Sequence, residues 1–281
     1  MFDGQFFPAG GNVGIQFEGG RPFNRYRGKD AKEIVDLLGI GTALEICADV
    51  GDSSSYDGSS QTWLDLSGNG YDFFRGTTNG ADATDPTFNG SSGGLSSADY
   101  WSFDGGDYFT YDTTNETWMD NIHKDNALFS YICWIYPAGA AQNGICGTAQ
   151  PTTQVGFGSN INTSNGVLNF NISNGSGTLA RSISPNLGAA DGAWQMAAYS
   201  IDEAGDVYTA FLNGTSATGA ASYSSPSAAA ATNTFRIATR GGASTPPPNG
   251  ARMAMYLAWS RALSLSEITA FYAASRWRFG V

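Results

Sequence analysis

The sequence predicts an all-β protein, built as a two-sheet antiparallel sandwich or jelly roll with a single helix near its C-terminus. Charged residues make up only 14% of the chain and glycines number 37, which disfavours long solvated helices. Aromatic residues make up 13%, and short aromatic or β-branched runs alternate with Gly, Asn and Asp. A chain of 281 residues accommodates one large domain or two small ones.

Residues 1–42 differ from the rest of the chain, because they are rich in glycine and aromatics and lack a clear period. Within them, "DAKEIVDLLGIG" predicts a short helix that Asp30 caps, with Glu33 three residues later and Gly39 at its end. Such a segment is too short to make a core of its own. We therefore expect it to lie against the main domain or against a partner.

From residue 43 onwards the pattern is that of β-strands. The run "LFSYICWIYP" is aromatic and β-branched enough for a central strand, and a proline closes it. Turn residues join two pairs of strands as hairpins, 166–173 with 177–184 and 193–202 with 207–214. The other predicted strands are 43–50, 71–76, 100–104, 108–112, 128–137, 234–240 and 252–260.

The late stretch "SLSEITAFYAAS" predicts a helix over 264–276, because Ser264 and Glu267 form a capping box and an apolar stripe follows. We expect this helix to pack on the edge of the sandwich. The low-complexity stretches within 215–250 are predicted to be exposed loops without a catalytic role.

The net charge of −11 is unevenly distributed. Residues 33–225 carry 21 acidic and three basic side chains, whereas residues 226–281 carry six arginines and one acid. An acidic body repels nucleic acid and anionic membranes, so neither is an expected partner. No apolar run is long enough to span a membrane and the first residues lack a secretory pattern, so we expect synthesis and folding in a cytoplasm.

The three cysteines are odd in number and show no C-x-x-C spacing, which argues against a disulfide framework or a zinc site. Cys47 and Cys133 lie in apolar runs and are interpreted as small buried hydrophobes.

Two acidic stretches are candidates for a binding site. In "TWLDLSGNGYDFF" (62–74), Asp65 precedes a Ser-Gly-Asn-Gly turn, which predicts either a calcium or sugar loop or a structural corner that sets strand register. In "FDGGDYFTYD", Asp104, Asp107 and Asp112 supply some calcium ligands, although a hairpin with an Asp-Gly turn explains them as well. No cofactor is expected, and calcium is the one candidate ion.

Several blocks between about 43 and 276 together resemble one family. "ALEICADVGDSSSYDGSSQTWLDLSGNGYDFF" resembles the opening of a laminin-G-like jelly roll, with the concanavalin A-like lectin/glucanase fold. The later steps of such a domain resemble "FDGGDYF", "FSYICWIYP", "DGAWQMAAYSIDEAGDVYTAFLNG" and "AWSRALSLSEITAFYAAS". The resemblance implies a concanavalin A-like jelly-roll domain over 43–281. It also implies a function among lectins, adhesion modules, glycosidases and virion parts.

An enzyme is not expected. Glucanases of this fold carry paired carboxylates in an E-x-D-x-E pattern, which this sequence lacks. Asp202, Glu203 and Asp206 lie close together but at a predicted turn. The single histidine, His123, lies in a polar connection and is interpreted as an exposed loop residue. We therefore expect no hydrolysis of polysaccharides.

Sugar binding is open as a role for four aromatic residues that could stack on a pyranose ring or, alternatively, fill the core: Tyr100, Trp101, Tyr111 and Trp118.

The N-terminal segment 1–42 is predicted to be an attachment segment, as in the bacteriophage proteins that this chain resembles. Its phenylalanines have no core of their own, and arginines accompany them, as in interface hot spots. The candidate docking residues are Phe6, Phe7, Phe17, Arg21, Phe23, Arg25 and Arg27. The alternative is that 1–42 folds back on its own sandwich as an extra strand and helix.

The predicted function is that of a structural virion protein of a bacteriophage, a capsid decoration, spike or tail component that displays a lectin-like jelly roll. Its expected partners are other virion proteins, further copies of itself in a larger assembly, and a host-surface glycan. The alternative function is a carbohydrate-binding adhesion module of a bacterial surface protein.

Overall fold

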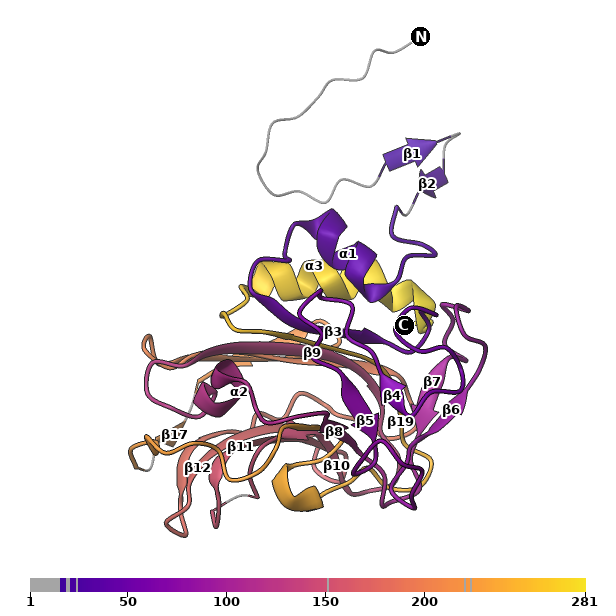
Figure 1. Ribbon diagram of the computed structural model, residues 1–281. Coiled ribbons are helices and arrows are strands. Elements are labelled where there is room, and N and C mark those ends of the chain that lie inside the picture. Colours follow the sequence, from indigo (N-terminus) through magenta and orange to yellow (C-terminus); the bar gives the residue numbers. More distant parts are fainter. Residues whose placement is uncertain (1–15, 19–20, 24, 151, 220, 223) are drawn as a thin grey trace.

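The computed structural model describes residues 16–18, 21–23, 25–150, 152–219, 221–222 and 224–281. Its body is a sandwich of two antiparallel sheets (Figure 1), which confirms the predicted fold class. The nine-stranded sheet runs in the order β17 (Ala221–Ser222), β13 (Leu179–Ile183), β12 (Val167–Asn174), β11 (Val155–Asn162), β10 (Gln142–Gly147), β18 (Arg236–Ile237), β8 (Phe109–Tyr111), β5 (Phe73–Arg75) and β4 (Thr62–Trp63).

The eight-stranded sheet forms the other layer. It runs in the order β16 (Thr215–Thr218), β15 (Val207–Leu212), β14 (Gln195–Asp202), β9 (Leu128–Tyr136), β19 (Arg252–Trp259), β7 (Tyr100–Ser102) and β6 (Thr87–Asn89), and β3 (Leu44–Asp49) also pairs with β19. The central strand β9 is the one that "LFSYICWIYP" predicts. Both predicted hairpins are confirmed, as β12 with β13 and β14 with β15.

Aromatic side chains fill the space between the sheets, where Tyr131, Phe157, Phe170 and Tyr199 are fully buried and contact one another. The hydroxyls of these two tyrosines have partners: that of Tyr131 lies 2.6 Å from the hydroxyl of Ser159, and that of Tyr199 lies 2.6 and 2.9 Å from the carbonyls of Leu168 and Ile183. The buried hydroxyls of Tyr208 and Tyr256 have no hydrogen-bond partner among the described residues. The burial of many large rings supplies the main stabilisation of the sandwich.

Two helices cover the outer face of the eight-stranded sheet, α1 (Ala31–Leu38) and α3 (Leu265–Ser275), which pack against each other (Figure 1). Both have the predicted capping boxes, at Asp30 and Ser264. The prediction that α3 packs on the edge of the sandwich is wrong, because the indole of Trp134 on the central strand β9 donates to Ser275 on α3. This large outward-facing ring needs cover, and the helix supplies it.

The helix within the predicted attachment segment belongs to the core of the sandwich. Ala31, Ile34 and Val35 are buried in the same hydrophobic cluster as the two sheets. The backbone N–H of Ala31 donates to the carboxylate of Asp49 on β3, and the indole of Trp259 donates to the carbonyl of Ile40. Residues from Tyr26 onwards therefore pack with the body, as the fold-back alternative predicts for the helix.

Short elements complete the chain. They are the ribbon strands β1 (Gln16–Glu18) and β2 (Arg21–Phe23), the helix α2 (Thr117–Asn121), and the 3-10 turns η1 (Gly241–Ala243) and η2 (Arg276–Arg278). Within the described part of the chain, no helix has the length and apolar character needed to cross a membrane.

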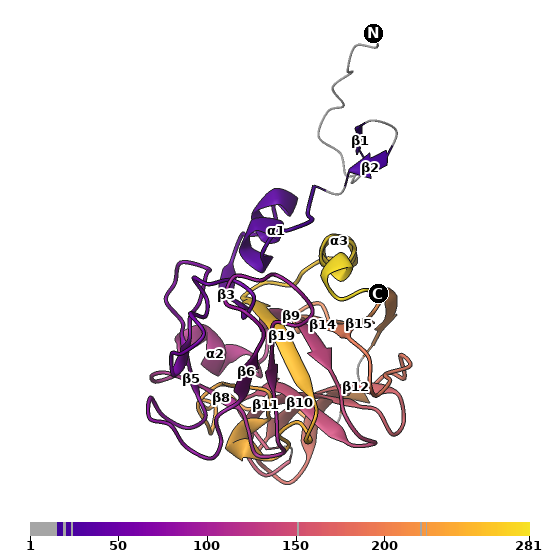
Figure 2. The same ribbon diagram turned by 90° about the vertical axis from the view of Figure 1, so that its right-hand side faces the viewer.

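The interpretation of "FDGGDYFTYD" as a hairpin is wrong. β7 pairs with β6 and β19 in the eight-stranded sheet, whereas β8 pairs with β5 and β18 in the nine-stranded sheet. The "FDGGD" stretch between them therefore crosses from one sheet to the other. The loop between β5 and β6 makes a second crossing at the same end of the sandwich, on the side that Figure 2 faces.

Candidate functional site

The Ser-Gly-Asn-Gly turn after Asp65 is a structural corner. One carboxylate oxygen of Asp65 accepts from the backbone N–H groups of Cys47 and Ser67, both at 2.8 Å. The other oxygen accepts from the N–H of Tyr71 at 3.3 Å, and the Asn69 amide donates to the carbonyl of Leu44 at 3.0 Å. Since both oxygens of Asp65 are engaged by the chain itself, this turn fixes β3 against the following strand and has little left to offer a ligand.

The candidate sugar-stacking aromatics are largely core residues. Trp101 is fully buried and packs edge-to-face on Trp63, and Tyr111 is also buried. Tyr100 and Trp118 are half-buried. The core interpretation is thus confirmed for Trp101 and Tyr111. On the part of the surface that the structure describes, no two of these four rings lie together on one exposed face.

The interpretation of His123 as an exposed loop residue is wrong. Its side chain is fully buried, and its Nε2 lies 3.0 Å from the carbonyl of Ala229. Burial lowers the pKa of His123, so the ring is neutral at pH 7 and donates to that carbonyl. His123 therefore holds the 224–232 loop against α2 and has no carboxylate partner among the described residues.

The acids of the β14–β15 turn do not form a catalytic pair. Glu203 is buried and forms an ion pair with Arg181 at 2.8 Å, and Asp202 accepts from the backbone N–H of Gly205. Glu203 and Asp202 therefore each have a structural partner, although the buried Oε2 of Glu203 has no hydrogen bond among the described residues.

All three cysteines are buried and free. Burial raises the pKa of each thiol, that of Cys146 to about 12, so they are inert apolar groups, as predicted for Cys47 and Cys133.

The candidate docking residues are only partly described. Phe6 and Phe7 lie outside the described residues, and the backbones of Phe17, Arg21 and Phe23 lie in the β1–β2 ribbon. Arg25 donates to the carbonyl of Leu37 on α1, and Arg27 is exposed. The docking role of these residues stays a prediction.

The strongest candidate site is a polar pocket of about 320 Å³ at the end of the sandwich where the β5–β6, β7–β8 and β18–β19 connections cross between the sheets. We call it the acidic pocket. Its polar lining consists of Asp82, Asp85, Thr87, Ser102, Asp104, Asp107 and Asn249, and Phe103 supplies the aromatic part.

Two of these crossing loops bring the acidic residues of this pocket together. Asp82 and Asp85 lie between β5 and β6, and Asp104 and Asp107 lie between β7 and β8. Tyr108 ties the loops to each other, because its N–H donates to the carbonyl of Thr84 at 3.2 Å and its carbonyl accepts from the N–H of Gly76. The pocket wall is therefore held by backbone hydrogen bonds.

Asp107 is the most deeply placed acid of the acidic pocket, with 3% of its surface exposed. One of its oxygens accepts from the N–H of Asp104 at 2.8 Å. Burial raises the pKa of Asp107 to about 7, and the charges of Asp104 and Asp85 add to the rise. Near neutral pH this carboxyl therefore exists in both forms, one of which donates a hydrogen bond.

Asp85 keeps an unused acceptor. Its Oδ2 accepts from the Gln61 amide at 2.9 Å, whereas its buried Oδ1 has no hydrogen-bond partner among the described residues. Among all the residues that the structure describes, no three His, Cys, Asp or Glu side chains are grouped so that they could hold a metal ion. Carboxylates spread around a cavity suit a ligand with several hydroxyl groups better than they suit one cation.

The sequence names Asp104 and Asp107, but it does not show Asp82, Asp85 or Asn249 as their neighbours. The only trace of this pocket in the sequence is the short acidic run "DATDP", which contains Asp82 and Asp85. That run points to the pocket only once β5 and β6 are known to lie in different sheets.

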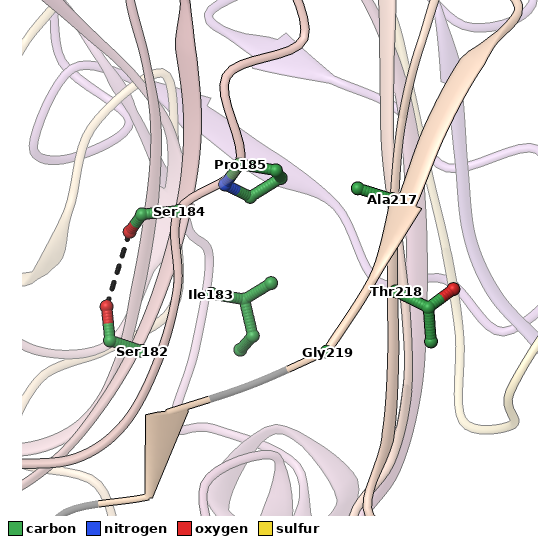
Figure 3. A pocket seen from close by; sticks show the side chains of 7 residues that line it. All are labelled: Ser182, Ile183, Ser184, Pro185, Ala217, Thr218 and Gly219. Carbon is green, nitrogen blue, oxygen red and sulfur yellow. Dashed lines mark hydrogen bonds between the residues drawn. The ribbon is translucent and has the colours of Figure 1, made fainter.

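A second, smaller groove of about 210 Å³ lies between the end of β13 and the edge strand β16. Figure 3 shows Ile183 and Pro185 turned toward Ala217, while the hydroxyls of Ser182 and Ser184 face each other at 3.2 Å on the far side. This groove offers few hydrogen-bonding groups to a polar ligand, so the acidic pocket is the better candidate.

Solved structures of similar fold include binding domains of botulinum neurotoxins. The receptor-binding domain of botulinum neurotoxin D matches with a TM-score of 0.52 at 11% identity, covering 83% of this chain and 53% of that one. The binding domain of botulinum neurotoxin DC in complex with SialylT matches with a TM-score of 0.52 at 13% identity, covering 84% and 52%. A structure concerning the dependence of botulinum neurotoxin C entry on two ganglioside molecules matches with a TM-score of 0.53 at 13% identity, covering 85% and 53%.

This chain spans about half the length of those solved chains, and at such identities the likeness is one of fold. No curated protein matches the chain. The family model described as the concanavalin A-like lectin/glucanases superfamily matches residues 103–269, which is more than half of the sequence. The chain therefore belongs to the concanavalin A-like lectin/glucanases superfamily.

Proposed function

We propose that this chain is a non-catalytic, lectin-like binding protein that holds a surface glycan in the acidic pocket. The observation that carries the proposal is the chemistry of that pocket. Carboxylates, the Asn249 amide and the hydroxyls of Thr87 and Ser102 surround a cavity of about 320 Å³ that is also lined by Phe103. Sugars present many hydroxyl donors beside apolar C–H faces, which is the complement of such a lining.

Fold likeness supports the class of ligand but does not identify it. One of the similar structures concerns a toxin that interacts with ganglioside molecules, and another is a complex with SialylT. Four aspartates line the acidic pocket, and their negative charge would repel an anionic sugar. The favoured ligand is consequently a neutral or amino sugar.

The proposal excludes hydrolysis, for a reason that lies in Asp107. With its raised pKa it is the one acid of the pocket suited to protonate a leaving group near neutral pH. Its side chain is nevertheless buried, and one oxygen is occupied by the N–H of Asp104. We therefore assign Asp107 a role in holding the ligand and no role as a general acid. The proposal includes no resident metal or cofactor.

The finer proposal is that this lectin-like domain is part of a bacteriophage virion, as a capsid decoration, spike or tail component. Its support is the resemblance of the chain to such phage proteins and the separate composition of residues 1–42. A bacterial surface adhesion module is the alternative, and it uses the same pocket. Copurification of the chain with particles, with and without residues 1–24, separates the two.

The test of glycan binding combines a glycan array with calorimetry. Wild type, Asp104→Asn and the control Asp191→Asn are compared, because Asp104 lines the pocket whereas Asp191 is an exposed acid elsewhere. An asparagine at 104 can still accept from the N–H of Gly106, so the loop is kept. We expect the array hits of wild type and Asp191→Asn to agree and Asp104→Asn to bind at least tenfold more weakly, about 1.4 kcal/mol. Equal binding by all three proteins would remove the acidic pocket from the proposal.

A further inference from the structure

Arg240 is a buried cation without an anion. Only 9% of its surface is exposed, and none of the ion pairs among the described residues includes it. The more deeply buried Arg278 is different, because both oxygens of Asp49 bind its Nη1 at 2.8 and 2.9 Å. Burial of a charge without a counter-charge is costly, so Arg240 requires a structural explanation.

The surroundings hold the Arg240 side chain in a fixed orientation. Its Nε donates to the hydroxyl of Thr245 at 2.8 Å, and its Nη2 donates to the amide oxygen of Gln142 at 2.7 Å. Both acceptors are neutral. The third nitrogen, Nη1, has no hydrogen-bond partner among the described residues. It is not one of their buried unpaired atoms either, so it is accessible to solvent.

Glycines in the neighbouring strands make room for this arrangement. A Cβ on Gly158 of β11 would lie 2.6 Å from the Cδ of Arg240, and a Cβ on Gly144 of β10 would lie 2.3 Å from the carbonyl oxygen of Thr245. The N–H of Gly144 donates to that carbonyl at 3.0 Å. Glycine within a strand is the residue that permits such a close approach. The aliphatic part of the Arg240 side chain therefore packs against Gly158, and two hydrogen bonds fix its guanidinium group.

We infer that the Arg240 guanidinium is an anion-binding site that takes one oxyanion group, a carboxylate or a sulfate, of an external ligand. A fixed guanidinium with a free edge matches the planar geometry of such a group. The lowered pKa of Arg240, to about 10 through burial, is consistent with a missing counter-charge. This site is lined by other residues than the acidic pocket and does not depend on the glycan proposal.

The test uses inorganic sulfate and, separately, acetate, with sodium chloride at matched ionic strength as the reference. Thermal unfolding is followed for wild type, Arg240→Gln and the control Arg252→Gln. Arg252 is half-exposed and stacks between Tyr100 and Tyr136, so its loss removes an arginine without touching the site. General exclusion of sulfate from protein surfaces stabilises all three proteins without saturation, and the control corrects for it.

We expect a saturable rise of Tm in wild type and Arg252→Gln, and its loss in Arg240→Gln, because only the native state offers the site. The stronger of sulfate and acetate identifies the oxyanion. In wild type alone, the ¹⁵N signal of the Arg240 Nε–H should shift and saturate over the same concentrations, so the test holds even if Arg240→Gln folds poorly. A Tm response shared by Arg240→Gln, or an Arg240 signal that does not shift, would overturn the inference.

Discussion

The buried ion pair between Asp49 and Arg278 is expected to be a major determinant of stability. Both side chains are at most 1% exposed, and Asp49 also accepts from the N–H groups of Ala31 and Gly51. One carboxylate therefore joins the start of α1, the end of β3 and the C-terminal turn η2. The guanidinium further donates to the carbonyl of Ser96 at 3.2 Å.

Replacement of Arg278 by methionine keeps much of the volume but leaves the Asp49 carboxylate buried without a counter-charge. Removal of one partner of a buried pair costs about 3–5 kcal/mol. For a domain of this size each kcal/mol corresponds to roughly 2–4 °C, so Tm should fall by about 6–20 °C. The double variant Asp49→Asn/Arg278→Met should recover part of this loss, because no isolated charge is left buried.

Equilibrium urea unfolding and calorimetry measure these effects. The control is Asp36→Asn, which breaks the exposed pair between Lys32 and Asp36 and should change stability by less than about 0.5 kcal/mol. The reasoning is refuted if Arg278→Met loses no more than the control, or if the double variant is as unstable as both single variants combined.

Three further predictions concern other parts of the chain. Because burial lowers the pKa of His123 below its unfolded value near 6.5, stability should fall as the pH drops below that value, and His123→Gln should lessen the fall between pH 7 and 5 in urea titrations. Gly158→Ala should destabilise by roughly 1–3 kcal/mol through overpacking against Arg240, measured by calorimetry; an unchanged Tm would show that the arginine moves aside freely. Removal of residues 1–24 should leave the urea midpoint unchanged while abolishing assembly with particles, whereas a lower midpoint would assign that segment to the core.

The strands with the strongest aromatic and β-branched patterns are predictable from sequence, and so are both helix caps. β9, β14 and β19 are buried on both faces and hold their large side chains between the sheets or under the helices. At the caps, Asp30 and Ser264 each bond a backbone N–H three residues away, so a local pattern is sufficient.

β10 and β11 escape prediction for a physical reason. "QNGICG" and "VGFGSNIN" contain glycines where strand propensity favours larger residues. Gly144 and Gly158 are needed because the 238–245 segment lies directly on them, a contact made by residues about 90 positions later in the chain. Thr239 and Arg240, at the end of the predicted strand 234–240, are buried, and so is Gly241, which was predicted to begin an exposed loop.

The acidic pocket is likewise a product of topology. Asp104 and Asp107 are recognisable as a candidate pair, but Asp85 and Asn249 reach them only because the β5–β6, β7–β8 and β18–β19 connections all cross between the sheets at the same end. No local spacing encodes that meeting. His123 was misjudged because a polar local sequence conceals a tertiary contact to the carbonyl of Ala229.

The central claim, that a glycan occupies the acidic pocket, is tested most directly by mapping chemical shifts in ¹H–¹⁵N spectra of wild type during titration with the best neutral array ligand. The account predicts that the largest saturable shifts cluster at the backbone amides of Asp82–Asp85, Asp104–Asp107 and Asn249–Gly250. Shifts centred instead on Ile183 and Ala217 in the smaller groove, or scattered without saturation, would contradict it.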